Sequence, residues 1–380
     1  MTSQEENVAP DKLDEQPQQL SLLKDITDQV STQSLRLWDS LVNVVFDDKK
    51  QLNRVAGKFL ETDTRQIEFE GNTLEVVRYP ARIGKGEDEK EVFPMKKDYK
   101  ILEALIKLAV DHADTGFYSD DEIVLTVKAS YYRVYQIFKS VTGKATFNYK
   151  QIEESIDTLS KSHTVFKYNG LEIKGSLISS YVGNRTDDLK KSEFLITFHP
   201  IISRIVLMGG FRESNLQRTL EARDMFTVFL YKKFVHNFKQ ASRKNSYHFS
   251  MNSLLKEVPS VAGWKRVEKK VEKVSESLGK LEGDVIKKWE ARKKYSEGPG
   301  QKKTIDCIFE VWFTDKFIDE QIRANAKGKH DLVVGSDGKA LDYPVRNNYS
   351  SSEEYVAALQ YYHAMKKEGG NQIVDKIFQK

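Results

Sequence analysis

Basic side chains are concentrated in one stretch of the sequence, from Arg243 to Lys303. This basic segment holds sixteen Lys and Arg against eight Asp and Glu, a net charge of +8, whereas the whole chain of 380 residues carries +4. Concentration of positive charge in one segment is typical of proteins that bind a polyanion through that segment. The alternative is a solvated charged face, which Glu268, Glu272 and Glu276 favour because acids pair with lysines one helical turn away.

Residues 261–281, inside the basic segment, have the spacing of an amphipathic helix. Five apolar residues recur at intervals of three and four and predict one buried stripe: Val267, Val271, Val274, Leu278 and Leu281. At about 100° per residue, the bases of this helix fall on the opposite side or flank it. These bases are Lys265, Arg266, Lys269, Lys270 and Lys273.

The residue types in this helix suit double-stranded DNA. The bases lie in its N-terminal half, which in a helix-turn-helix protein reaches the major groove. Arg266 is the candidate for a guanine contact, because only a guanidinium fork matches O6 and N7 together, and the lysines are candidates for phosphate contacts. A second basic group, expected at the tip of a β-hairpin, is placed to follow the DNA backbone: Arg292, Lys293, Lys294, Lys302 and Lys303.

The elements around the basic segment predict a helix-turn-helix followed by a β-hairpin. Periodicity predicts a helix at 216–238, a strand at 247–249, helices at 251–257 and 261–281, strands at 285–288 and 303–313, and a helix at 317–325. The same order occurs upstream, with helices at 99–110, 130–139 and 148–161 and strands at 122–126, 163–168, 171–182 and 192–198. This order is the winged-helix plan. The sequence therefore predicts a mainly helical α+β chain with two tandem winged-helix domains.

We expect five segments along the chain. They are a disordered acidic tail at 1–30, a helix (35–60) and strands (67–77) within 31–96, a first winged-helix domain at 97–210, a second at 211–328, and a linker with a helical extension at 329–380. The second domain is the expected main DNA reader. The first is less basic, and its candidates Arg133, Lys144 and Lys150 predict a weaker DNA contact or a contact with a second copy of the chain.

Other kinds of chemistry find little support in the sequence. One cysteine, Cys307, excludes an internal disulfide and a zinc cage, and it lies in an apolar run that predicts a buried thiol. The sequence has no phosphate-binding G-x-x-x-x-G-K-[ST] loop, no paired-histidine metal motif and no G-x-S-x-G nucleophile motif. With no apolar run of about 18 residues and no signal peptide, we expect a cytoplasmic protein that is not an enzyme, does not enter membranes and needs neither cofactor nor metal.

Three stretches of the sequence carry a resemblance to one family. Residues 176–232 hold SLISSY, SEFLITFHPIISRIVL and RTLEARDMFTVFLYK, and a second stretch is SVAGWKRVEKKVEKVSESLGKLEGDVI. The third, QLSLL in the acidic tail, is similar to the peptide by which bacterial replication proteins dock on the DNA polymerase sliding clamp. With these motifs, the chain resembles the plasmid replication initiators of the TrfA type, among the Rep-like tandem winged-helix initiators, over roughly residues 65–325.

The resemblance implies an initiator that binds repeated sites (iterons) at a plasmid origin and helps to open an A·T-rich segment. It implies recruitment of the host replication initiator, the replicative helicase and the sliding clamp, the last through Gln19, Leu20, Leu22 and Leu23. It also implies interconversion between homodimers and DNA-binding monomers, and copy-number control by repression of the protein's own promoter. Two alternatives stay open: a winged-helix transcriptional regulator, which needs no clamp peptide, and a protein scaffold, which would show no salt-sensitive DNA binding.

Overall fold

The computed structural model describes most of the two predicted winged-helix regions. The described residues are 31–46, 60–69, 72–84, 89–111, 117–119, 122–168, 171–184, 186–203, 211–297, 302–327, 333–334 and 340–341. The acidic tail 1–30, with the predicted clamp residues, lies outside them, as does most of the extension 329–380. Of the helix expected at 35–60, the described part is α2 (Arg36–Val45).

The first half of the described chain, residues 31–203, contains the expected upstream helices. The remaining helices of this half are α3 (Lys96–Asp111), α4 (Tyr131–Thr142), α5 (Tyr149–Lys161) and the 3-10 helix η3 (Leu189–Lys191). Its strands are β1 (Ser31–Leu35), β2 (Asp63–Phe69), β3 (Asn72–Tyr79), β4 (Ala81–Ile83), β5 (Lys90–Val92), β6 (Phe117–Ser119), β7 (Glu122–Val124), β8 (Thr126–Ser130), β9 (His163–Tyr168), β10 (Leu171–Ser176), β11 (Ile178–Asn184) and β12 (Glu193–Phe198). Local caps explain where two helices begin, because Ser130 accepts from the Arg133 amide and Asn148 forms a capping box with Gln151.

The second half, from residue 211 onward, repeats the order helix, strand, helices, hairpin. Its helices are α7 (Leu216–Glu221), α8 (Met225–Asn237), α9 (Met251–Leu255), α10 (Pro259–Ala262), α11 (Val267–Leu281) and α12 (Asp315–Lys327). Its strands are β13 (Phe211–Asn215), β14 (Tyr247–Ser250), β15 (Ile286–Tyr295), β16 (Thr304–Phe313), β17 (Val333–Val334) and β18 (Ala340–Leu341). The pairs are antiparallel and the sheets small, so the described chain is a mixed α+β structure rather than a mainly helical one.

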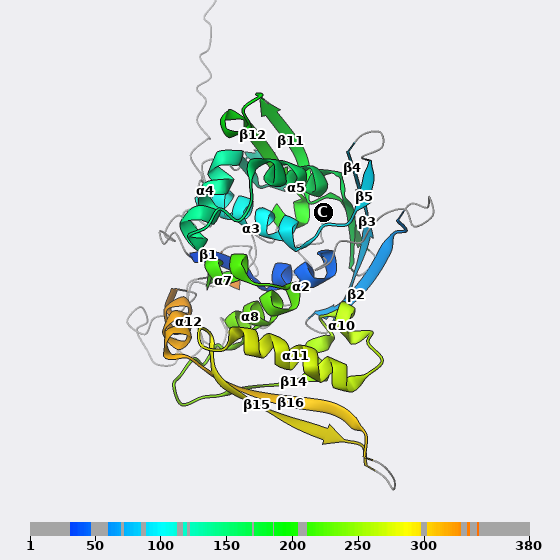
Figure 1. Ribbon diagram of the computed structural model, residues 1–380, viewed down its shortest axis with the longest axis vertical. Helices are drawn as coiled ribbons and strands as arrows, with labels where there is room; N and C mark the ends of the chain where they lie inside the picture. The colour runs from blue at the N-terminus through cyan, green and yellow to red at the C-terminus, as the bar shows by residue number, and fades with distance from the viewer. Residues whose placement is uncertain are drawn as a thin grey trace, which may run out of the picture.

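Two apolar cores meet at α8, which lies between the halves in Figure 1. The first core is built around α2, α3, α4 and α5, and α8 adds Met225 and Val228 to it. The second core is built around α11, β16 and α12, and α8 adds Phe229, Leu230 and Phe234. Residues on every side of α8 are buried, as expected of a helix that lies between two layers. The two halves are therefore packed on one shared helix.

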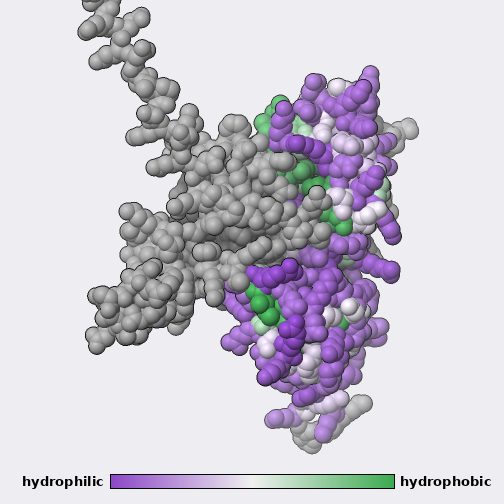
Figure 2. All heavy atoms as spheres, turned by 90° about the vertical axis from the view of Figure 1, so that its left-hand side faces the viewer, coloured by the Kyte–Doolittle hydropathy of each residue, from purple (hydrophilic) through white to green (hydrophobic). Residues whose placement is uncertain are grey.

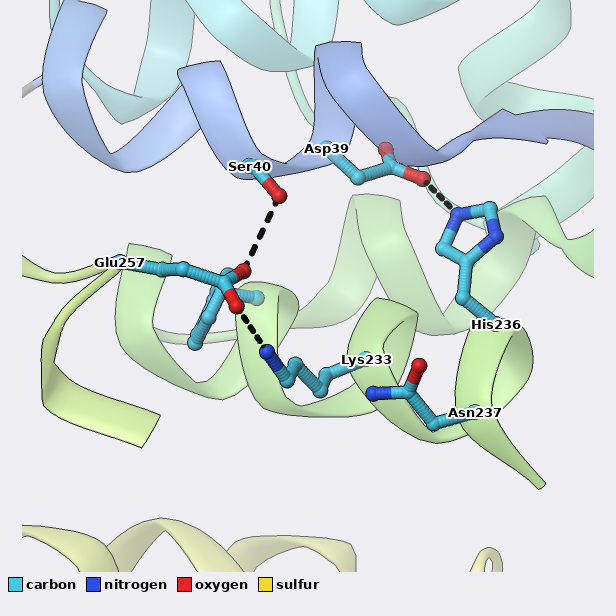
Figure 3. A pocket seen from close by; sticks show the side chains of 7 residues that line it. Asp39, Ser40, Lys233, His236, Asn237 and Glu257 are labelled. Carbon is cyan, nitrogen blue, oxygen red and sulfur yellow. Dashed lines mark hydrogen bonds and ion pairs between the residues drawn. The ribbon is translucent and has the colours of Figure 1, made fainter. Parts of the chain in front are cut away.

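The N-terminal elements join the two halves. Strands β2 and β3 extend the β9–β10 hairpin into a four-stranded sheet with the order β10-β9-β3-β2, while α2 packs against α8. Figure 3 shows the polar contacts at this junction: Asp39 on α2 is 2.8 Å from Nε2 of His236, and Ser40 donates a hydrogen bond to Glu257 over 3.1 Å. Lys233 of α8 donates to the same Glu257 carboxylate.

Several sequence predictions about element boundaries are wrong, and two of them change how the chain is connected. The helix expected at 216–238 is broken into α7 and α8, because Asp224 is extended and caps α8 by accepting from the Thr227 amide at 3.0 Å. The strand expected at 171–182 is two strands in two different sheets: β10 pairs with β9, whereas β11 pairs with β12. The chain changes sheet at Leu177, which is buried and whose carbonyl accepts from the His199 amide at 3.0 Å.

Candidate DNA interface

The apolar stripe of the basic helix lies as the sequence predicts. Val271, Val274, Leu278 and Leu281 of α11 are buried in the second core, and Val267 packs against it. The helix is held between α8 and the β15–β16 hairpin, since it contacts both. Burying one face in this way leaves the opposite face of α11 available to solvent.

The helix begins later than predicted, so part of the basic cluster lies in the preceding turn. Residues 261–281 form α10 and α11 rather than one helix, and Arg266 is the extended N-cap residue of α11. The turn is closed by two hydrogen bonds, from the Gly263 amide to Pro259 and from the Trp264 amide to Val261, at 3.2 and 3.1 Å. Lys265 and Arg266 therefore project from the end of the helix and not from its side.

The bases at this end of α11 are exposed. Lys265, Arg266 and Lys269 are all exposed, and together with Trp264 they line an open hollow of about 370 Å³. Lys269 also pairs with Glu272 on the same helix at 2.6 Å, a surface pair that solvent screens. The DNA-contacting residues predicted from the sequence did not include Trp264, and the hollow was not predicted. The signal that points to them is an aromatic residue placed directly before two bases.

Two other predicted bases on α11 lie differently. Lys270 is only partly exposed, and Lys273 is turned inward, with a side-chain exposure of 17%. Lys273 donates to Asp224 over 3.2 Å, and Lys280 donates to the same carboxylate over 2.9 Å. The expectation that Lys273 shares the outward side with Lys265 and Lys269 is wrong, because Asp224 draws it onto the end of α8.

The second basic group lies along a strand, and not only at a hairpin tip. Arg292, Lys293 and Lys294 are exposed residues of β15, while Lys302 and Lys303 are exposed residues just before β16. Side chains alternate along a strand, so Arg292 and Lys294 share one face of the hairpin and Lys293 lies on the other. Acidic residues reduce the net positive charge of the face that carries Arg292 and Lys294, since Arg292 is 3.1 Å from Glu310 and Lys294 lies across from Asp306.

The two basic groups of the second half lie at the same end of it. β15 starts beside the C-terminal end of α11 and runs back along it, so the C-terminal end of β15 and the N-terminal end of α11 both lie on the right in Figure 1. The helix also contacts both strands of the hairpin, so the two basic groups belong to elements that are packed on each other.

Two of the three candidates of the first half lie at helix starts, and the third lies in the turn between two helices. Arg133 lies in the first turn of α4, Lys144 in the turn between α4 and α5, and Lys150 in the first turn of α5, and all three are exposed. Neighbouring tyrosines divide between core and surface: Tyr131 is buried, whereas Tyr132 is 38% exposed beneath Lys190. Backbone amides at helix starts also favour anions, so a phosphate near Arg133 or Lys150 is favoured by the side chain and by the helix dipole, whereas Lys144 follows the C-terminal end of α4.

The coloured part of the face drawn in Figure 2 is mainly hydrophilic. In Figure 2 hydrophobic atoms gather only in small patches on the face shown, which is the left-hand side of Figure 1. Among the described residues, no group of His, Cys, Asp and Glu is arranged to hold a metal, and no helix is long and apolar enough to cross a membrane. Cys307 is buried as expected, and burial, with the Asp306 carboxylate, raises the pKa of its thiol.

Comparisons with known proteins find similarity of fold only. No protein-family model and no curated protein matches the chain. Among solved structures, it is similar to RctB domains 2–3, with 11% identity, a TM-score of 0.43, and coverage of 75% of this chain and 99% of that one. It is also similar to the Pi initiator protein, solved in complex with iteron DNA, with 12% identity, a TM-score of 0.39, and coverage of 63% and 98%. The narrower resemblance to the TrfA type stays a prediction.

Proposed function

We propose that the protein is a replication initiator that binds duplex DNA through two tandem winged helices. The observation that carries this is the exposed cluster of Lys265, Arg266 and Lys269 at the N-terminal end of α11, beside the basic β15–β16 hairpin. In a winged helix this end of the recognition helix enters the major groove and the hairpin follows the backbone. Arg266 is then placed to read a guanine, and the lysines to bind phosphates.

The first half supports the second in this proposal. Arg133, Lys144 and Lys150 hold register on a neighbouring groove, because exposed bases bind the phosphates that border it. The halves pack on the shared helix α8, so the spacing between their DNA contacts is set by the protein. Binding across two grooves at a fixed spacing can then bend or unwind the duplex, which is the work an initiator does at an A·T-rich segment.

The test of DNA binding is the double charge reversal Lys265→Glu with Lys269→Glu. Both residues are exposed, so the fold should survive, which circular dichroism and urea unfolding will check. We expect duplex affinity, measured by fluorescence anisotropy, to be lost. For the wild type, the slope of log affinity against log salt should correspond to about 5–10 phosphates, and the variant should lose about two of them.

A control variant with the same change in charge separates a local effect from a general one. Lys161→Glu with Lys174→Glu reverses two surface lysines of the first half, which pair with Asp157 and Glu172. Exposed pairs of this kind contribute little, so the control should fold and keep most of its DNA affinity. Equal affinity in the wild type and the Lys265/Lys269 variant contradicts the proposal. A control that loses as much affinity as the test variant contradicts the site.

The replication role rests on the tail peptide and is tested apart from DNA binding. Gln19→Ala with Leu22→Ala should abolish binding to the DNA polymerase sliding clamp and leave duplex binding unchanged. Clamp binding by the wild type supports the initiator, with origin repeats, the host initiator, the helicase and a second copy of the chain as further partners. DNA binding without any clamp binding instead supports the winged-helix transcriptional regulator. Footprinting on the replicon that encodes the protein will show whether its sites are repeated.

A further inference from the structure

Trp264 differs from the other exposed apolar side chains in what surrounds it. Its side chain is 41% exposed, and the hollow that it lines is otherwise lined by Lys265, Arg266 and Lys269. Single exposed apolar residues are common on protein surfaces and need no explanation. An exposed indole among three cations is a different case, because it combines an apolar contact surface with charges for the phosphates of a duplex.

The backbone holds Trp264 at the surface. Val258 and Val261 of the preceding turn are anchored in the second core, and Pro259 starts the short helix α10. The Trp264 amide donates to the Val261 carbonyl over 3.1 Å, two residues before the N-cap residue Arg266. The indole is thus fixed at the end of α11 that the proposed function puts into the groove.

We propose that Trp264 contacts the C5 methyl group of a thymine in the major groove, beside the guanine that Arg266 contacts. This inference rests on the proposed function, since it requires the N-terminal end of α11 to lie in the groove. The thymine methyl is the apolar group that base edges present there, and apolar side chains recognise it by contact. The hollow then reads two neighbouring bases: a thymine by its methyl group and a guanine by its two acceptors.

The first experiment selects binding sites from a random-sequence duplex library with the full-length wild type and with Trp264→Ala. The wild-type sites should share a thymine next to a guanine. The sites selected by the variant should keep the guanine and lose the thymine, because Arg266 is unchanged. The salt dependence of binding should also be unchanged, because no cation is removed.

The second experiment replaces the selected thymine by deoxyuridine, which keeps the base pair and removes only the methyl group. The wild type should lose affinity by about 4-fold, the factor for one buried methyl group, and Trp264→Ala should not respond. Trp264→Phe keeps an apolar face and should keep part of the discrimination. As a matched control, Ile322→Ala removes an exposed apolar side chain from α12, 44% exposed, and should discriminate like the wild type.

The results that would contradict the thymine contact differ from those that would contradict the proposed function. A thymine preference that survives in Trp264→Ala overturns the inference and leaves the proposed function standing. Weaker binding of the variant to single-stranded oligonucleotides, with unchanged duplex binding, also overturns it, because the indole then stacks on an unpaired base. A wild type that enriches no duplex overturns the proposed function and this inference together.

Discussion

Lys273, one turn beyond the exposed end of α11, donates a hydrogen bond of 3.2 Å to Asp224, the residue that caps α8. A second lysine of the same helix, Lys280, donates to the other oxygen of that carboxylate over 2.9 Å. One acid therefore caps the N-terminus of α8 and also holds α11 against it, which fixes the orientation of α11 relative to the helix shared by both cores.

Substitution of Lys273 should change the stability of the protein, whereas substitution of Lys269 should change its DNA binding. Lys273→Ala should lower the free energy of unfolding by about 1 kcal/mol, since it removes a partly buried charge-assisted bond, and should change the salt slope of DNA binding little. Lys269→Ala should reduce that slope by about one and leave stability unchanged, because its pair with Glu272 is exposed. Urea unfolding and salt titrations of both variants will show this. The same phenotype in both variants would mean that the contact with Asp224 does not matter.

The charge of Asp224 should stabilise the protein above pH 4. Burial alone would raise the pKa of this carboxyl, but the hydrogen bond from Lys280 and the charge of Lys273 lower it from 3.8 to about 2. Since the folded pKa is lowered, the stabilisation is present above pH 3.8 and is lost as the pH falls through about 2. Asp224→Asn, which can still cap the helix, should cost about 2 kcal/mol at pH 7 and nothing near pH 2. Urea unfolding at a series of pH values will measure the difference in unfolding free energy between the wild type and the variant. A difference that does not change with pH would show that the charge of the Asp224 carboxylate does not cause the stabilisation.

The buried Lys232 should be essential for stability. Its ammonium group, 1% exposed, lies 3.7 Å from Asp39 and 4.0 Å from Glu103, and these carboxylates raise its pKa despite burial. Lys232→Met leaves two buried carboxylates without their cation and should cost about 3–5 kcal/mol. The double variant with Glu103→Gln should recover part of this loss, because one carboxylate is then neutral. No recovery in thermal unfolding would show that packing, and not charge, explains the loss.

The guanidinium of Arg218 should not be replaceable by an ammonium. Arg218 on α7 makes forked contacts with Asp284, before β15, and with Glu320 on α12, at 2.5–3.1 Å. Arg218→Lys keeps the charge but loses the fork, and should destabilise the second half by about 1.5–3 kcal/mol. The matched control is Arg243→Lys, because Arg243 also pairs with two acids, Asp315 and Asp319, but is 58% exposed and should tolerate the change. Equal urea midpoints for the two variants would contradict a special role for the fork.

Local pattern was enough to predict most helices. The stripe of Val271, Val274 and Leu278 is a property of neighbouring residues, because helical periodicity places them on one face whatever lies opposite. The break in the helix at Asp224 was not predictable in this way. The sequence from 216 to 238 keeps apolar residues at helical spacing on both sides of Asp224, and the residues that hold Asp224 in place lie about fifty positions further along the chain.

The assignment of strands to sheets also needed the tertiary structure. Alternation predicts strands in 171–182, but it does not say that β10 joins β9, β3 and β2 while β11 joins β12 and β8. Pairing between distant strands depends on which partners fold against them, and a strand's own sequence carries little of that information. For the same reason, the role of β2 and β3 as an extension of the first half's sheet was not foreseen.

The sequence by itself determines how much charge the chain carries and where along the chain it is concentrated. The surplus of eight positive charges between residues 243 and 303 is read directly from the sequence. Which of those charges face solvent was decided by tertiary contacts. Lys269 and Lys273 are one helical turn apart and look equivalent in the sequence, yet one is exposed and the other is bonded to Asp224. The physical reason is that a lysine side chain is long enough to reach any acid that packing brings near it, and that acid comes from a different helix.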